Sequence, residues 1–164
     1  MTRTVRPVLS ADLLAMMVRG VSVNVASRDA ALRPSLMRAV GSDVAPDGSR
    51  ITVYLARSQS GQLLQDIAST GQLAVVFSQP STHRSVQVKA TAATLRPAAE
   101  ADRAVLARYL ASMEHEVASV GFPPPLTRAM LAHRIEDVVA VTFTPQEAFD
   151  QTPGPRAGKS LEGP

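Results

Sequence analysis

The stretch that decides the fold is residues 72–92, QLAVVFSQPSTHRSVQVKATA, which contains two strand-like runs joined by a short polar link. Residues 73–77 are an unbroken apolar run, which predicts a strand buried on both faces. Residues 86–91 alternate apolar and polar side chains, so Gln87 and Lys89 share one face. The stretch therefore predicts a β-hairpin whose second strand has a polar side that either meets solvent or lines a site.

Working outward, the chain gives strand patterns at residues 21–26, 34–40, 51–56 and 138–143. Helix patterns lie at about 10–18, 62–70, 97–120 and 126–133. Links of hairpin length join neighbouring strands, which predicts a closed or nearly closed, mainly antiparallel barrel with helices outside it, a mainly β fold with α (α+β). The predicted core consists of Val23, Val25, Val53, Leu55, Leu73, Val75, Phe77, Val86, Val88, Val139 and Val141.

Length and composition indicate one ordinary globular domain. The chain has 164 residues, of which 45% are hydrophobic and 19% charged, and we assign residues 1–150 to the domain and 151–164 to a polar, Pro/Gly-rich tail. Its 17 basic and 14 acidic residues are scattered, which argues against nucleic-acid binding. The absence of cysteine excludes disulfides and thiolate sites. The longest early apolar run, residues 13–18, is too short to span a membrane, so we expect no membrane partner and a cytoplasmic location.

Few motifs carry chemistry by their spacing alone. Residues 154–160, GPRAGKS, resemble a phosphate-binding P-loop but have three residues rather than four between the glycines, and no helix follows. The three histidines lack the spacing of metal ligands, so no metal site is predicted. Glu114 and Glu116 are two residues apart on one predicted helix, which favours a solvated face over an acid–base pair.

Four segments together have a family likeness: residues 33–38 (RPSLMR), 51–55 (ITVYL), the loop and helix at 60–70, and the strand within 82–92 (THRSVQVKATA). Their order over residues 13–150 resembles the pyridoxamine 5′-phosphate oxidase-like flavin-binding split barrels. The tail at 149–158, FDQTPGPRAG, is similar to the ending of an uncharacterised subgroup. The resemblance implies a six-stranded antiparallel split β-barrel with peripheral helices. It also implies a homodimer that holds FMN in clefts at the subunit interface.

The resemblance further implies a flavin-dependent oxidoreductase acting on an unknown small molecule. In the oxidase proper, an Arg-Lys pair at the start of the helix after the third strand binds the phosphate; Gln62 and Leu63 stand there in this chain. The C-terminal Trp and the Arg-His-rich substrate segment are also missing, so the chain is not the true oxidase. Catalytic residues are not assigned. The expected FMN-binding residues are Arg38, Arg57, Ser58, Ser60, His83, Arg84, Gln87 and Lys89.

Two alternatives stay open, because a fold does not fix a function. The protein could be a non-enzymatic binder of flavin, or of haem through His83 or His133. It could also be a dimeric scaffold whose ancestral cofactor site has degraded. The visible spectrum of the purified protein separates these hypotheses, since flavin and haem absorb differently.

Overall fold

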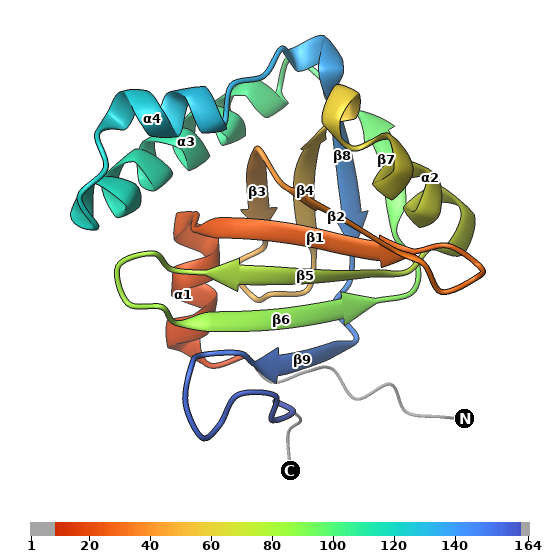
Figure 1. The fold of residues 1–164 in the computed structure, drawn as a ribbon, viewed down its shortest axis with the longest axis horizontal. Coiled ribbons are helices and arrows are strands. Elements are labelled where there is room, and N and C mark those ends of the chain that lie inside the picture. The colour runs from red at the N-terminus through yellow and green to blue at the C-terminus, as the bar shows by residue number, and fades with distance from the viewer. Residues whose placement is uncertain (1–8, 162–164) are drawn as a thin grey trace.

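A computed structural model describes residues 9–161, which form two antiparallel sheets with helices around them (Figure 1). The helices are α1 (Ala11–Arg19), α2 (Gly61–Thr70), α3 (Asp102–Ser119) and α4 (Pro124–Met130), with single 3₁₀ turns η1 (Arg57–Gln59) and η2 (Ile135–Asp137). The strands are β1 (Ser22–Arg28), β2 (Pro34–Arg38), β3 (Gly41–Val44), β4 (Ile51–Ala56), β5 (Leu73–Ser78), β6 (Ser85–Ala90), β7 (Thr94–Pro97), β8 (Val138–Phe143) and β9 (Glu147–Asp150).

The two sheets differ in size and run across each other. The five-stranded sheet has the order β2-β1-β5-β6-β9, and the four-stranded sheet has the order β3-β4-β8-β7. In Figure 1, β1, β5 and β6 of the first sheet run nearly horizontally in front of the steeply inclined strands of the second. This confirms the predicted α+β class and the antiparallel barrel with peripheral helices. The barrel is built from two sheets that total nine strands in the described part of the chain, not from six strands.

Three strands of four residues each, β3, β7 and β9, were not expected from the sequence. Pro97 was predicted to open the long helix, but it ends β7, opposite Val139 of β8. Proline is tolerated there because β7 is an edge strand. Helix α3 begins five residues later, where the Asp102 carboxylate accepts a hydrogen bond from the Ala99 N–H (2.7 Å). Residues 147–150, for which no strand was predicted, pair with β6 as β9.

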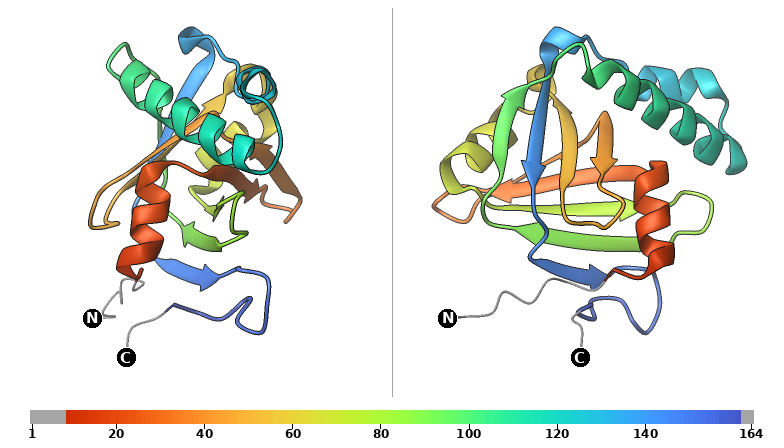
Figure 2. Two further views of the ribbon diagram at one scale, coloured as in Figure 1. Left: turned by 90° about the vertical axis from the view of Figure 1, so that its left-hand side faces the viewer. Right: turned by 180° about the vertical axis from the view of Figure 1, so that it is seen from behind.

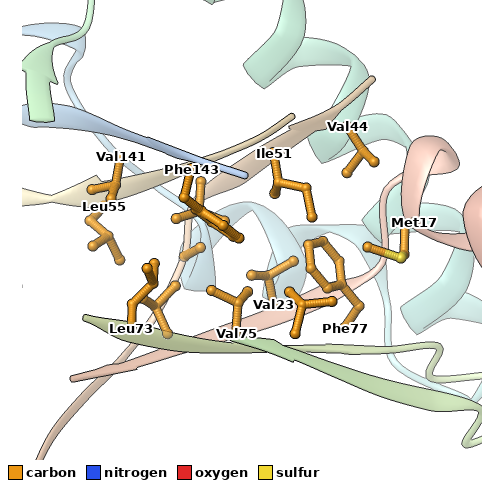
Figure 3. Packing of buried hydrophobic residues seen from close by; sticks show 14 of the residues in the cluster. Met17, Val23, Val44, Ile51, Leu55, Leu73, Val75, Phe77, Val141 and Phe143 are labelled. Atoms are coloured by element: carbon orange, nitrogen blue, oxygen red, sulfur yellow. The ribbon is translucent and has the colours of Figure 1, made fainter. Parts of the chain in front are cut away.

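The hydrophobic core lies between the two sheets (Figure 3). All the predicted core residues are buried. Helix α1 closes one end of the barrel with Met17, and the Ser10 hydroxyl caps that helix by accepting from the Leu13 N–H (3.3 Å). One expectation was wrong: β5 is buried on one face only, since Ala74 and Val76 are partly exposed on the other.

Helices α3 and α4 lie side by side and extend beyond the sheets (Figure 2). The inner side of α3 carries Leu106, Tyr109 and Met113, whereas Val120, at the predicted end of the helix, is 43% exposed. Glu116 does not lie on a solvated face as predicted; only 4% of it is exposed. Among residues 9–161, none of the helices has the length and apolar character that crossing a membrane requires.

The C-terminal segment follows β9 through a series of turns and then returns to it. Ser160 forms an isolated β-bridge with Phe149, and the Leu161 N–H donates to the Ala148 carbonyl (2.8 Å). The P-loop-like residues 154–160 are therefore turn and bridge residues that precede no described helix. The division of the chain at residue 150 stays a prediction.

Candidate functional site

The outer face of the five-stranded sheet is not covered by any helix of the described chain, as Figure 1 shows. Strand alternation sends every second side chain to this face. The strand register aligns these side chains in two rows that cross all five strands. One row is Leu36, Ala26, Ala74, Lys89 and Glu147. The next row is Arg38, Asn24, Val76, Gln87 and Phe149.

A cleft of about 420 Å³ opens where β1 ends and β5 begins, and we call it the sheet cleft. It is lined by residues 26–28, 72–74, 89–91, 146 and 147. The Arg28 guanidinium donates from Nη2 to Gln72 Oε1 (3.0 Å), and Lys89 Nζ lies 4.8 Å from the centre of the Phe149 ring. Within residues 9–161 neither cation forms an ion pair, although Glu147 also lines the cleft. Two cations against one carboxylate make this cleft suited to an anion.

A glycine brings the walls of the sheet cleft together. Gly71 ends α2 with φ 69°, and a Cβ added there would lie 2.6 Å from the Thr91 carbonyl oxygen. Only glycine combines this left-handed backbone with such a close approach. The connection from α2 to β5 therefore runs directly against the end of β6, which places Gln72 beside Arg28 in the cleft.

The junction between β4 and α2 contains three of the predicted site residues. Ser58 donates from its N–H (3.0 Å) and its hydroxyl to the Asp137 carboxylate. Ser60 is 2% exposed, and its hydroxyl has no hydrogen-bond partner among residues 9–161. Arg57 and Gly61 border a second cleft of about 410 Å³. Donors for an anion are present here, but Asp137 already occupies the two that Ser58 offers.

Gln62, at the position of the missing phosphate clamp, has a structural partner. Its Nε2 donates to the buried Asp66 carboxylate (2.8 Å), which also accepts from the Ser35 hydroxyl (2.6 Å) on β2. These bonds connect α2 to the edge of the five-stranded sheet. Gln62 therefore stabilises the fold locally.

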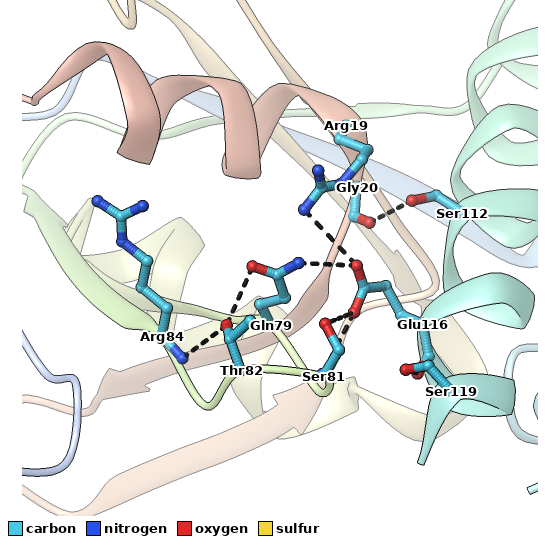
Figure 4. A network of polar contacts seen from close by, with 9 residues as sticks. All are labelled: Arg19, Gly20, Gln79, Ser81, Thr82, Arg84, Ser112, Glu116 and Ser119. Carbon is cyan, nitrogen blue, oxygen red and sulfur yellow. Dashed lines mark hydrogen bonds and ion pairs between the residues drawn. The ribbon is translucent and has the colours of Figure 1, made fainter. Parts of the chain in front are cut away.

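His83 and Arg84 lie in the turn between β5 and β6, which Glu116 holds in place (Figure 4). Glu116 accepts hydrogen bonds from Gln79 Nε2 (2.9 Å) and the Ser81 hydroxyl (2.7 Å). Burial acts to raise the pKa of Glu116, but the bonds from Ser81 and Gln79 outweigh it, so the pKa lies below its usual value. His83 itself is exposed, with φ 60°, and donates its N–H to the Gln79 carbonyl (2.8 Å).

The eight predicted site residues do not meet in one place in the single chain. Lys89 lines the sheet cleft, Arg57 the second cleft, and Arg38 a groove beside α3 and α4. Arg84 and Lys89 stand at opposite ends of β6, five residues apart and thus about 16 Å along the strand. Lys89 lines the sheet cleft and Arg84 does not, so the described cleft offers a phosphate only one of the two.

Sequence reasoning missed Arg28 and Gln72 as partners of Lys89. The signal for Arg28 was strand alternation. Arg28 is an even number of residues from Asn24 and Ala26 on β1, so the three side chains point to the same outer face. The outward position of Arg28 could be linked to Lys89 only once the strand order was known. Strand β5 lies between β1 and β6, and residues of all three strands line the cleft.

No protein-family model and no curated protein matches this chain. Solved structures do resemble it. A candidate pyridoxamine 5′-phosphate oxidase from Lactobacillus delbrueckii is 17% identical with a TM-score of 0.55, covering 91% of this chain and 97% of its own. HupZ from group A Streptococcus is 13% identical with a TM-score of 0.56, covering 92% and 100%. A protein described as F420 reductase is 14% identical with a TM-score of 0.55, covering 82% and 93%. At such identities the likeness establishes the fold alone.

Proposed function

We propose that this chain, which has the split-barrel fold of pyridoxamine 5′-phosphate oxidase-like proteins, binds FMN as a homodimer and acts as an oxidoreductase on a small molecule. One observation carries the proposal: the uncovered face of the five-stranded sheet ends in a cleft with two cations that form no ion pair among residues 9–161. The oxidase and reductase names of two structural neighbours support a redox role.

The uncovered face supports the dimer. Leu36 on β2 is 65% exposed, and Ala26, Ala74, Val76 and Phe149 on the same face are partly exposed. Leu36, Ala26, Ala74 and Val76 form an apolar strip over β2, β1 and β5, which Gln87 and Lys89 on β6 separate from Phe149. Such a strip favours a protein contact over solvent. A second copy related by a two-fold axis would present the same strip, so the contact is self-complementary. The sheet cleft at the margin of this face would then be walled by both subunits.

The side chains of the sheet cleft fit the phosphate of FMN. A phosphate dianion in a partly buried site requires charged donors, and Arg28 and Lys89 provide a guanidinium and an ammonium. The volume of about 420 Å³ lies within the range of small-molecule sites. The β4–α2 junction fits less well, because Asp137 places a carboxylate on the donors of Ser58 and would repel a phosphate.

When bound, FMN supplies the hydride and electron transfer chemistry. The protein's contribution is binding and orientation. The side-chain amides of Gln72 and Gln146 line the same cleft and would hydrogen-bond to the polar edge of a planar ring. Covering the face with a second subunit would exclude water from it. No residue is assigned as catalytic.

Haem is less well supported than flavin. His133 uses Nδ1 in a hydrogen bond to the Leu131 carbonyl (2.9 Å), and His83 stands in an exposed turn. No cluster of three or more potential metal ligands occurs within residues 9–161. Neither histidine lines the sheet cleft, the second cleft or the groove beside α3 and α4.

The test compares FMN with riboflavin, which lacks the phosphate, in titrations of wild type, Lys89→Ala and Arg28→Ala. Each substitution should weaken FMN binding by about 1.5–3 kcal/mol, the scale of a charge-assisted hydrogen bond. Riboflavin binding should change little. Arg103→Ala is the matched control, because Arg103 is half-exposed on α3 and lines none of the clefts. Equal losses for both ligands, or no FMN binding by wild type, would refute the proposal.

A further inference from the structure

Exposed apolar side chains collect in a groove between α3, α4 and the start of β1, which we call the helix groove. Seven large hydrophobic residues are exposed in the described chain, and four of them line this groove: Val120, Phe122, Leu126 and Met130. Such a concentration in one hollow is unlike the scattered apolar residues of an ordinary surface and marks a binding site. The groove has a volume of about 270 Å³, just below the range for drug-sized ligands, so its ligand is small.

A cation stands at one side of this apolar groove. Arg38 on β2 lines it and donates from Nη1 to the Ser22 hydroxyl (2.6 Å). The Arg38 side chain is partly buried, yet no carboxylate of residues 9–161 forms an ion pair with it. A guanidinium has five donors, and an uncompensated charge beside apolar walls favours an anionic partner. Residues 9–161 thus supply no carboxylate for the charge of Arg38.

A second polar group of the groove also has no partner. Thr127 on α4 lines the groove, is 0% exposed, and its hydroxyl makes no hydrogen bond within residues 9–161. Buried hydroxyls are normally hydrogen-bonded, since leaving one unpaired is unfavourable. A ligand oxygen would satisfy it. Arg38 and Thr127 together indicate a ligand with an anionic or oxygen-bearing head and an apolar body.

We propose that the helix groove binds a small apolar carboxylate, with the carboxylate on Arg38 and the apolar body between α3 and α4. The groove walls include Met113 and Met130, whose flexible thioether side chains adapt to the shape of an apolar body. A carboxylate matches the planar fork of a guanidinium, with two parallel hydrogen bonds. This inference does not depend on flavin binding, and its test uses no flavin.

The experiment titrates 3-phenylpropionate and its uncharged amide, 3-phenylpropionamide, by calorimetry into wild type, Arg38→Gln and Arg103→Gln. Wild type should bind the carboxylate at least tenfold more tightly than the amide. Arg38→Gln should abolish this preference, and the exposed Arg103→Gln should keep it. Equal affinity of wild type for both probes, a preference retained in Arg38→Gln, or no binding by wild type would overturn the inference.

Two further variants separate binding from folding. Leu126→Asp changes a side chain that is 49% exposed on the groove wall, so the melting temperature should hold while carboxylate affinity falls at least tenfold. Thr127→Val should not lower the melting temperature, because its hydroxyl has no hydrogen-bond partner among residues 9–161 to lose, but it should weaken the binding of both probes. Unchanged binding in Leu126→Asp would overturn the inference even if Arg38→Gln fails to fold. Loss of a dimer in Leu126→Asp without probe binding would assign the groove to a second copy instead.

Discussion

Replacing Asp102 by Asn tests how the barrel holds its long helix. The Asp102 carboxylate, 6% exposed at the start of α3, accepts two hydrogen bonds from Arg96 (2.7 and 2.9 Å), one from the Tyr54 hydroxyl (2.9 Å) and one from the Ala99 N–H (2.7 Å). These donors come from β7, β4 and the loop before α3. Asn keeps the shape but offers one oxygen, and it turns an amide NH₂ toward donors that then have no acceptor.

The magnitude follows from these four bonds. The Arg96 side chain is 50% exposed, so its ion pair is discounted to the scale of a surface pair, about 0–1 kcal/mol. The buried bond from Tyr54 to a charged acceptor contributes about 1.5–3 kcal/mol. We expect Asp102→Asn to lower the free energy of unfolding by about 2–3 kcal/mol at neutral pH. Glu100→Gln is the control, because its carboxylate is 82% exposed, and it should leave stability nearly unchanged.

The stability difference between wild type and Asp102→Asn should also depend on pH in a defined direction. The Arg96 hydrogen bonds hold the pKa of Asp102 well below its usual value, against the opposing effect of burial. A lowered folded pKa stabilises the protein above the unfolded pKa, near 3.9, and this contribution is lost as the pH falls toward the folded value. The difference between wild type and Asp102→Asn in urea denaturation should therefore shrink at about pH 3. A loss below about 0.5 kcal/mol at neutral pH, or one equal at both pH values, would refute the reasoning.

Three further predictions concern the connection from α2 to β5, the homodimer and the turn between β5 and β6. Gly71→Ala should lower the free energy of unfolding by at least about 1 kcal/mol, since φ is 69° and the new Cβ would lie 2.6 Å from the Thr91 carbonyl oxygen; an unchanged urea midpoint would argue against this constraint. Leu36→Asp should reduce the mass measured by light scattering from twice 17.4 kDa to 17.4 kDa without lowering the melting temperature, and a wild-type monomer at micromolar concentration would exclude the dimer. Glu116→Gln should speed hydrogen exchange at the Ser81 amide, and equal protection in both proteins would show that the turn does not need this carboxylate.

The sequence predicted the core well on β1 and β6, because apolar residues there recur with a period of two. Val23, Val25, Val86 and Val88 alternate with polar or small residues, and each is fully buried. The unbroken apolar run at 73–77 wrongly predicted that both faces of β5 are buried. Ala74 and Val76 are apolar, but they lie on a side that no element of the described chain covers. Apolar character at such positions marks a contact surface as well as a core.

The short strands and the site were beyond sequence reasoning for a physical reason. Strand β7 has one large apolar residue, Leu95, and its pairing comes from its partner β8, so no local pattern predicts it. The sheet cleft likewise depends on register. Arg28 and Lys89 come from strands that are not adjacent, and they line one cleft only because β5 separates them by a single strand.

The visible absorption spectrum of freshly purified protein tests the flavin proposal most directly. Protein that binds FMN should show bands at about 370 and 450 nm, the positions typical of an oxidised flavin, with FMN identified after release by denaturation. Because a cofactor can be lost during purification, a colourless sample is next incubated with FMN and passed through a desalting column. Protein that stays colourless after this step, or shows a Soret band in place of the flavin bands, would contradict the account.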